Sequence, residues 1–195
     1  MKQYDQAMWE VHTSLSKLGI SYAIIGGAAV QYWGEPRLTQ DIDLTISAPL
    51  EDLAGFVRQI LELFSPRFED ALDFALENRV ILVETSNGYP LDVSLGLPGY
   101  EEKVIERVVQ IELEAGKRIS ICSAEDLIIY KATAGRAQDI RDIEGIVFRQ
   151  GNRLDIIYIR QWLTEISDIT SNPDLSDLFE SPWNNYQENN LSDRP

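Results

Sequence analysis

One stretch of the sequence constrains the fold more than any other. An apolar run, residues 20–25, leads directly into Gly26 and Gly27 and then into a short helical segment. A second apolar run then carries Asp41 and Asp43, which are separated by one isoleucine. Because successive side chains of a strand point to opposite faces, the two aspartates share one face. The stretch therefore predicts a strand, a glycine turn, a short helix and a strand with two carboxylates.

A third aspartate, Asp92, lies among apolar neighbours in a later predicted strand. That strand follows residues 79–84 through Asn87-Gly88, a dipeptide typical of a β-hairpin. A charge inside a strand is costly unless it is paired, capped or bound to a metal ion. Carboxylates that lie close together raise one another's pKa, and divalent cations bind hard oxygen ligands. Asp41, Asp43 and Asp92 together therefore predict a site for Mg²⁺ or Mn²⁺.

The remaining sequence predicts an α/β fold, with a short mixed β-sheet flanked by helices and a helical C-terminal part. Apolar residues recur at helical spacing in residues 5–18 and 50–64, and a hairpin is expected over residues 108–122. Ser123 is the expected N-cap of the first of three later helices. We expect three regions: an α/β core at 1–122, a helical part at 123–169 closing the cleft, and a polar, partly disordered tail at 170–195.

Composition narrows the class of protein. The chain has 17 Lys and Arg against 32 Asp and Glu, and the resulting net charge of -15 opposes broad contact with a phosphate backbone. Cys122 is the single cysteine, so no disulfide framework forms within the chain. No apolar run approaches membrane-spanning length, and the N-terminus lacks the apolar core of a signal peptide. We expect a cytoplasmic protein with no membrane partner.

Each site feature also has a purely structural interpretation. A glycine pair before a helix is often only a tight turn. Arg37, Lys131 and Arg136 are candidates for holding a triphosphate, and they are equally suited to salt bridges with the many acids. Thr39 either hydrogen-bonds near the metal loop or is a residue that favours the start of a strand. The combination favours the metal site, because three carboxylates together are costly without a cation.

Three motifs carry a resemblance to a known family: Gly26-Gly27, Asp41-Ile42-Asp43 and Leu91-Asp92-Val93. They resemble the signature of the nucleotidyltransferase (polymerase β-like) superfamily. Residues 37–43, together with residues 125–127, Lys131 and residues 135–142, are similar to abortive-infection-type toxins and related bacterial nucleotidyltransferase-like proteins. The resemblance covers residues 20 to about 150.

The resemblance implies roles for these residues. Asp41 and Asp43 would hold Mg²⁺ (or Mn²⁺) bridging the triphosphate, and Asp92 would share the metal or help to deprotonate the attacking hydroxyl. Gly26 and Gly27 would let the backbone approach the phosphates, where the N–H groups of a helix start favour anions. Further nucleotide-binding candidates are Arg37, Thr39, Lys131 and Arg136.

The implied reaction is transfer of a nucleoside monophosphate from an NTP such as ATP to an acceptor hydroxyl, with release of pyrophosphate. The acceptor is a protein side chain, the 3′ end of an RNA such as tRNA, or a small molecule. Membership of a toxin–antitoxin pair, with an antitoxin or regulatory protein as partner, is part of the same hypothesis. Two alternatives stay open: a catalytically inactive nucleotide- or partner-binding module, and a metal-dependent phosphohydrolase.

Overall fold

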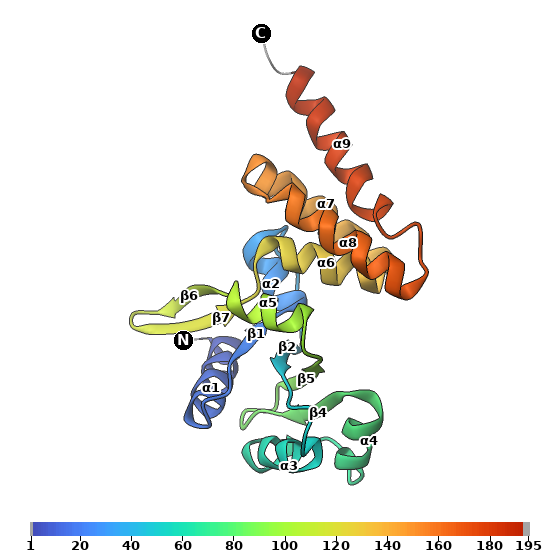
Figure 1. Ribbon diagram of the computed structural model, residues 1–195. Helices are drawn as coiled ribbons and strands as arrows, with labels where there is room; N and C mark the ends of the chain where they lie inside the picture. Colours follow the sequence, from blue (N-terminus) through green and yellow to red (C-terminus); the bar gives the residue numbers. More distant parts are fainter. Residues whose placement is uncertain (1, 193–195) are drawn as a thin grey trace. The chain divides into compact units, whose positions relative to one another are not determined.

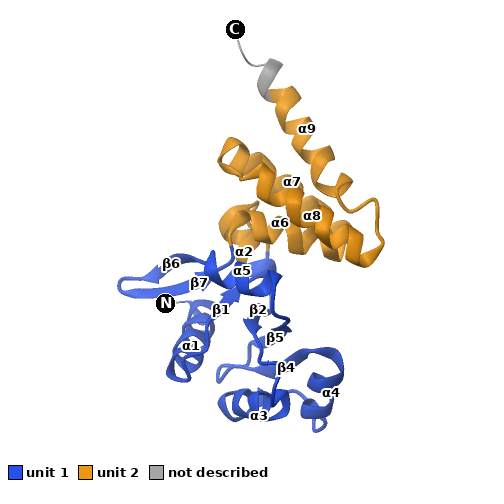
Figure 2. Cartoon of the chain, in the orientation of Figure 1, with its two compact units in different colours: residues 1–28, 38–122 blue, residues 29–37, 123–195 orange. Residues whose placement is uncertain are grey.

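The computed structural model describes residues 2–192, and the chain divides into two compact units (Figure 2). Unit 1 comprises residues 1–28 and 38–122, and unit 2 comprises residues 29–37 and 123–195. The short segment 29–37 therefore belongs to unit 2 although strands of unit 1 flank it in the sequence.

Unit 1 is built on one mixed sheet of seven strands in the order β3-β4-β5-β2-β1-β7-β6. Figure 1 labels its strands except β3. The strands are β1 (Tyr22–Ile24), β2 (Ile42–Ser47), β3 (Ser65–Pro66), β4 (Val80–Glu84), β5 (Pro90–Gly96), β6 (Val109–Glu114) and β7 (Lys117–Ile121). This confirms the α/β fold with a mixed sheet that the sequence predicts. β3 was not expected, because two exposed residues give no periodic pattern.

The pairing of the central strands positions the carboxylates. β2 runs antiparallel to β1 and parallel to β5, and the register places Asp43 directly beside Asp92. Residues paired in this way on adjacent strands point to the same face of the sheet. β4 and β5 form the antiparallel hairpin that Asn87-Gly88 predicts. The alternation of Ile42 and Leu44, both fully buried, fixes this register because a slip of one residue would bury the aspartates.

Four helices lie wholly within unit 1: α1 (Gln3–Lys17), α3 (Leu53–Leu63), α4 (Ala71–Asn78) and α5 (Tyr100–Glu106). α1 buries Ala7, Val11 and Leu15 and packs against β7. α3 buries Val57 and Ile60 and packs against α4. Apolar residues at helical spacing thus cover the sheet, as the periodicity predicts.

Unit 2 is helical. α2 (Gly26–Trp33) begins in unit 1 and ends in unit 2, which also contains α6 (Ala124–Ala134), α7 (Ala137–Gln150), a 3₁₀ turn η1 (Gly151–Arg153), α8 (Ile156–Thr170) and α9 (Asp177–Ser192). α6 packs against α7, α8 and α9. As expected, Ser123 is the N-cap of α6, and its hydroxyl accepts a hydrogen bond from the backbone N–H of Asp126 at 3.1 Å.

The tail is more regular than its polarity suggests. The sequence predicts a polar, partly disordered segment at 170–195, and the structure has α9 over Asp177–Ser192 within it. Leu175 and Phe179 are fully buried, and α9 packs against α7, so these two apolar side chains anchor an otherwise polar segment. Residues 193–195 of the predicted tail lie outside the described residues.

Within residues 2–192, none of the helices has the combination of length and apolar character that crossing a bilayer requires.

Candidate active site

The glycine pair accommodates two side chains of the candidate site. Gly26 has a φ of +61°, in the left-handed region that glycine adopts without strain, and it opens α2. A Cβ at Gly26 would collide with the carboxylate of Asp43, and a Cβ at Gly27 would collide with the hydroxyl of Thr39. The two glycines therefore let Asp43 and Thr39 approach the first turn of α2.

Asp41 lies immediately before β2, one residue outside the strand that the sequence predicted to include it. Thr39 Oγ1 donates to Asp41 Oδ1 at 2.8 Å and so orients the carboxylate. The hydroxyl of Tyr4, from the first turn of α1, donates to the backbone carbonyl of Asp41 at 2.9 Å. Burial and the charges of Asp41 and Asp43 raise the pKa of Tyr4, so its hydroxyl stays a protonated donor.

Asp92 has a cationic partner within unit 1. Arg67 Nη2 donates to Asp92 Oδ1 at 2.5 Å, and both side chains are about one-third exposed. The pKa of Asp92 is nevertheless raised above its usual value, first by burial and then by the charge of Asp41, while Arg67 opposes the shift. The negative charge of Asp41 therefore acts on Asp92 as well as on Tyr4.

The donor chemistry of these carboxylates fits a divalent cation, because hard oxygens are gathered around adjacent strand positions. Within residues 2–192, however, no group of three or more His, Cys, Asp or Glu side chains is arranged to hold a metal ion. Arg67 lies against Asp92. The Asp41-Asp43-Asp92 ligand set therefore stays a prediction, and any cation that uses Asp92 must replace the Arg67 contact.

The predicted basic residues Arg37, Lys131 and Arg136 all belong to unit 2, where they meet two carboxylates. Lys131 Nζ lies 2.8 Å from Asp139 Oδ1 and 2.8 Å from Asp142 Oδ2, and the lysine side chain is only 6% exposed. Arg37 donates to both oxygens of Asp142 at 3.0 Å.

Arg136 lies at the surface end of the same cluster. Its Nε donates to Asp139 Oδ2 at 2.6 Å, and its side chain is 75% exposed. The buried lysine and the bidentate Arg37 match the geometry of structural ion pairs, which was the alternative interpretation of these residues. Their role in binding a nucleotide stays a prediction.

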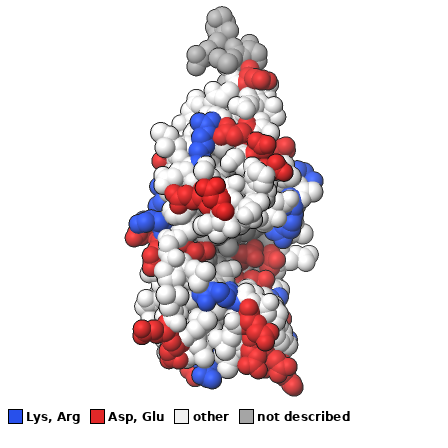
Figure 3. Space-filling model, turned by 45° about the vertical axis from the view of Figure 1, so that its right-hand side comes forward, with Lys and Arg blue, Asp and Glu red and all other residues white. Residues whose placement is uncertain are grey.

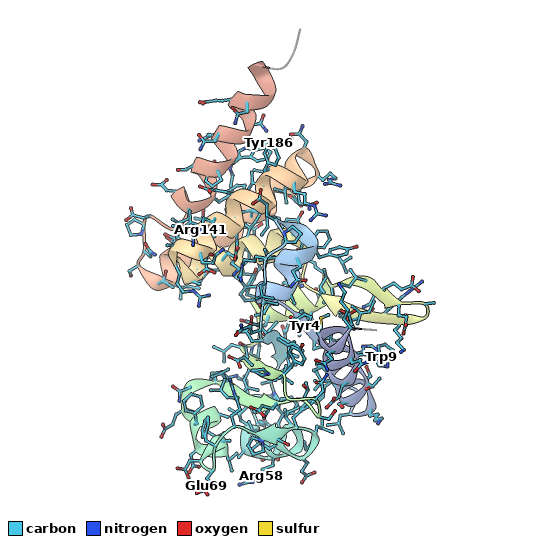
Figure 4. The ribbon with its side chains drawn as sticks, turned by 180° about the vertical axis from the view of Figure 1, so that it is seen from behind. Tyr4, Trp9, Arg58, Glu69, Arg141 and Tyr186 are labelled. Atoms are coloured by element: carbon cyan, nitrogen blue, oxygen red, sulfur yellow. The ribbon has the colours of Figure 1, made fainter. Side chains whose placement is uncertain are left out.

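Two residues at the site were missed from the sequence, Tyr4 and Arg67. Tyr4, labelled in Figure 4, lies in the first turn of α1. Its ring packs edge-on against Tyr89 with the ring centroids 5.5 Å apart. Arg67 follows the two-residue strand β3. Neither residue belongs to a sequence motif, and both contact the aspartates only through tertiary packing. The sequence indicated that Asp92 needs a positive partner, but it did not indicate which residue supplies it.

Charge on the visible surface agrees with the composition. On the face drawn in Figure 3, acidic side chains are spread over the molecule and basic ones stand between them in small groups. A long polyanion gains little from such a surface, because it needs a continuous basic track.

A family model described as a nucleotidyltransferase of unknown function (DUF6036) matches residues 1–191. The chain therefore belongs to this family, in agreement with the superfamily that the glycine and aspartate motifs indicate. Curated proteins gave no match to the sequence.

Among solved structures, the chain is similar to an antigenic nucleotidyltransferase-like protein from Paracoccidioides brasiliensis, with a TM-score of 0.48, 16% identity and coverage of 90% of this chain and 91% of that one. The solution structure of the antibiotic-resistance factor ANT(2'')-Ia has a TM-score of 0.48 and 17% identity, with 98% and 96% covered. A crystal structure of ANT(2'')-Ia with adenylyl-2''-tobramycin has a TM-score of 0.49 and 18% identity, with 95% and 99% covered. Similarity at this level concerns the fold alone.

Proposed function

We propose that this chain is a metal-dependent nucleotidyltransferase that moves a nucleoside monophosphate from an NTP to an acceptor hydroxyl and releases pyrophosphate. The observation that supports this most directly is the register of β2 and β5. It places Asp43 beside Asp92, while Gly26 lets Asp43 approach the first turn of α2. Membership of the nucleotidyltransferase family supports the same reaction class.

In this proposal Asp41 and Asp43 hold Mg²⁺ or Mn²⁺, and Asp92 joins them when Arg67 moves aside. The bound cation would neutralise charge on the triphosphate and align it for attack. Thr39 keeps Asp41 oriented through its 2.8 Å hydrogen bond. The backbone N–H groups at the start of α2 favour the phosphates, because they carry the positive end of the helix dipole.

Asp92 is the proposed proton acceptor for the attacking hydroxyl. Asp92 takes this role when it does not hold the cation, since its pKa is raised in the metal-free chain and a base works best when its pKa lies closer to the operating pH. The hydroxyl oxygen then forms a bond to the α-phosphorus, the bond from that phosphorus to the bridging oxygen breaks, and the electron pair leaves with pyrophosphate.

Arg37, Lys131 and Arg136 remain proposed contacts of the nucleotide phosphates. Each of them already has a carboxylate partner that a phosphate would have to replace. The net charge of -15 favours a neutral or cationic acceptor over RNA, since an acidic field attracts cations and repels polyanions. We therefore favour a small polyhydroxylated amine or a basic protein, including a toxin–antitoxin partner, over a tRNA end as the acceptor.

The test is transfer of label from each of the four α-labelled NTPs in the presence of Mg²⁺ or Mn²⁺, with amines, proteins and RNA from a cell lysate as acceptors. We expect labelled acceptor and pyrophosphate from the wild type and a loss of at least about 100-fold in Asp43→Asn, more than an outer-shell change costs. Asp73→Asn, on the exposed side of α4, is the matched control and should keep full activity. Transfer that is absent with every NTP and acceptor would contradict the proposal.

A second candidate, an inactive nucleotide- or partner-binding module, is favoured by one observation. Arg67 already forms an ion pair with Asp92, and within residues 2–192 no three acidic, His or Cys side chains are arranged to hold a metal ion. Calorimetry separates the two functions. The enzyme requires Mg²⁺ for tight NTP binding and loses that binding in Asp43→Asn, whereas the partner module binds its partner equally well with that substitution.

A further inference from the structure

A cavity in unit 1 has a lining unlike the group of carboxylates at the candidate active site. It has a volume of about 390 Å³, within the range of small-molecule sites. Its polar wall consists of His12, Ser16, Ser21, Tyr22, Gln110 and Ser120. Ile20, Ile105 and Val108 supply an aliphatic wall. The lining has no Asp, Glu, Lys or Arg, although a quarter of the chain is charged.

The cavity lies at the opposite end of β1 from the carboxylates. Tyr22 begins β1 and pairs with Ile46, whereas the aspartates lie at the other end of β2, near the turn that follows Ile24. Gly26 follows Tyr22 by four positions, which corresponds to roughly 13 Å of extended chain. α1 reaches both places, because it carries Tyr4 to Asp41 and His12 to the cavity. The cavity is therefore a separate site from the carboxylate cluster.

Hydrogen bonds fix the polar wall of the cavity. His12 Nδ1 lies 3.0 Å from the Tyr22 hydroxyl, which accepts from the backbone N–H of Ser120 at 3.3 Å. Gln110 Nε2 donates to Ser120 Oγ at 2.7 Å. Trp9 stacks on the imidazole with the ring centroids 4.9 Å apart, and Figure 4 labels Trp9 on α1. These contacts hold the polar groups in place before any ligand binds.

The protonation states make this wall uncharged near neutral pH. Burial lowers the pKa of His12, so the imidazole is neutral. Burial raises the pKa of Tyr22 to about 12, so the phenol keeps its proton. Its O–H group can therefore donate a hydrogen bond to His12 Nδ1. The imidazole proton then lies on Nε2, which leaves His12 as a donor.

The chemistry of the lining selects a class of ligand. An anion finds no Lys or Arg in the lining and is repelled by the acidic chain, and a cation finds no carboxylate. An uncharged flat ring satisfies both walls, since its faces contact the aliphatic residues and its polar edge meets the donors and acceptors. Hydroxyl groups attached to such a ring match the serines. We propose that this cavity binds an uncharged nucleoside, independently of the carboxylate site.

His12 makes the test specific because it is the single histidine of the chain. Its imidazole C–H signal is followed by NMR in the full-length protein while adenosine, inosine, cytidine or uridine is added without Mg²⁺. We expect at least one nucleoside to shift this signal saturably with a Kd of about 1 mM or below. Ser16→Phe, which fills the cavity from an exposed position on α1, should abolish the shift, whereas Lys17→Phe, at the next exposed position, should preserve it.

The proposal is overturned if none of the four nucleosides gives a saturable shift, or if Ser16→Phe shows an equal shift with an unchanged circular dichroism spectrum. Asp43→Asn should bind the nucleoside as the wild type does. Loss of the shift in Asp43→Asn would place the nucleoside at the carboxylates and would also overturn the proposal. A failure of nucleotidyl transfer leaves the result at this cavity unaffected, because the titration contains no metal and no triphosphate.

Discussion

Asp92 in unit 1 has a raised pKa, whereas the pKa values of Asp139 and Asp142 in unit 2 lie below their ordinary value. Burial by itself would raise the pKa of all three carboxyl groups. In unit 2, hydrogen bonds from Arg136, Lys131 and Arg37 outweigh burial. In unit 1, Arg67 only partly offsets burial, and the charge of Asp41 adds to it. The two units therefore contain carboxylates in opposite electrostatic situations.

This difference separates stability from function. A carboxylate with a lowered pKa stabilises the fold when it is ionised, whereas one with a raised pKa makes its ionised form costly to the fold. An energetic cost of ionisation is typical of carboxylates in binding and catalytic sites, because the positive charge that would offset it is supplied by the bound substrate or metal. We therefore expect substitutions in the unit 2 cluster to act on stability and those around Asp92 to act on binding and activity.

The largest effect on stability is expected for Lys131→Met. The change leaves Asp139 and Asp142 buried without the cation that they share, and breaking a buried ion pair costs about 3 kcal/mol. Urea denaturation followed by circular dichroism measures the loss. Lys103→Met, on the exposed surface of α5, is the control and should leave the midpoint unchanged.

The same variant tests whether Lys131 serves the nucleotide instead. If calorimetry shows that Lys131→Met keeps the stability of the wild type and loses NTP binding, the cluster is functional and the contrast between the units fails. Lower stability together with unchanged NTP affinity at a temperature where the variant is folded would establish the structural role.

Acid should weaken the ion pairs of unit 2, whereas Asp92 in unit 1 takes up its proton at a higher pH without destabilising the fold. Because the pKa values of Asp139 and Asp142 are lower in the folded chain, their contribution is present above the ordinary value of 3.8 and is lost as the pH falls through the folded values. Protonation of Asp92 has the opposite sign and favours the folded chain. Urea midpoints measured from neutral pH to below about pH 4 should fall, and the fall should be smaller in Asp142→Asn. An equal pH dependence in that variant would assign the acid sensitivity to other groups.

The sequence predicted those parts of the molecule that local patterns encode. Strand alternation predicted that Ile42 and Leu44 face away from Asp43, and the Asn87-Gly88 turn predicted the β4–β5 hairpin. The N-cap at Ser123 fixed the start of α6. The mixed sheet followed from the order of these elements, because the strand and helix signals agree along residues 20–122.

The partners of the site residues could not be predicted in this way. Arg67 reaches Asp92 across 25 positions of sequence, and Tyr4 reaches Asp41 across 37. Arg37 bonds to Asp142 across 105. Periodicity describes which face a side chain takes within its own element, but it does not determine which distant element meets that face. The sequence therefore suggested the carboxylates and left their counter-charges open.

Arg67→Gln tests the contrast at Asp92 directly. Removing the guanidinium frees Asp92 for a cation, so Mn²⁺ should bind about fivefold more tightly, which corresponds to about 1 kcal/mol for a partly exposed pair. Electron paramagnetic resonance of Mn²⁺ in the absence of nucleotide measures the affinity. Arg58→Gln, on the exposed face of α3 (Figure 4), is the control. Weaker Mn²⁺ binding in Arg67→Gln would show that Arg67 positions Asp92 and does not compete for it.

The smallest effect is expected for Tyr4→Phe. The substitution keeps the ring that packs on Tyr89 and removes only the hydroxyl that donates to the Asp41 carbonyl, a bond worth about 0.5 kcal/mol at a partly exposed position. If Tyr4 holds Asp41 in place for the cation, Mn²⁺ affinity should fall about twofold, in line with that energy. Tyr32→Phe, at a half-exposed tyrosine of unit 2, should change neither the stability nor the Mn²⁺ affinity. Lower stability with unchanged Mn²⁺ affinity would show that the Tyr4 hydroxyl supports the fold alone, and Asp41 would then owe its orientation to Thr39.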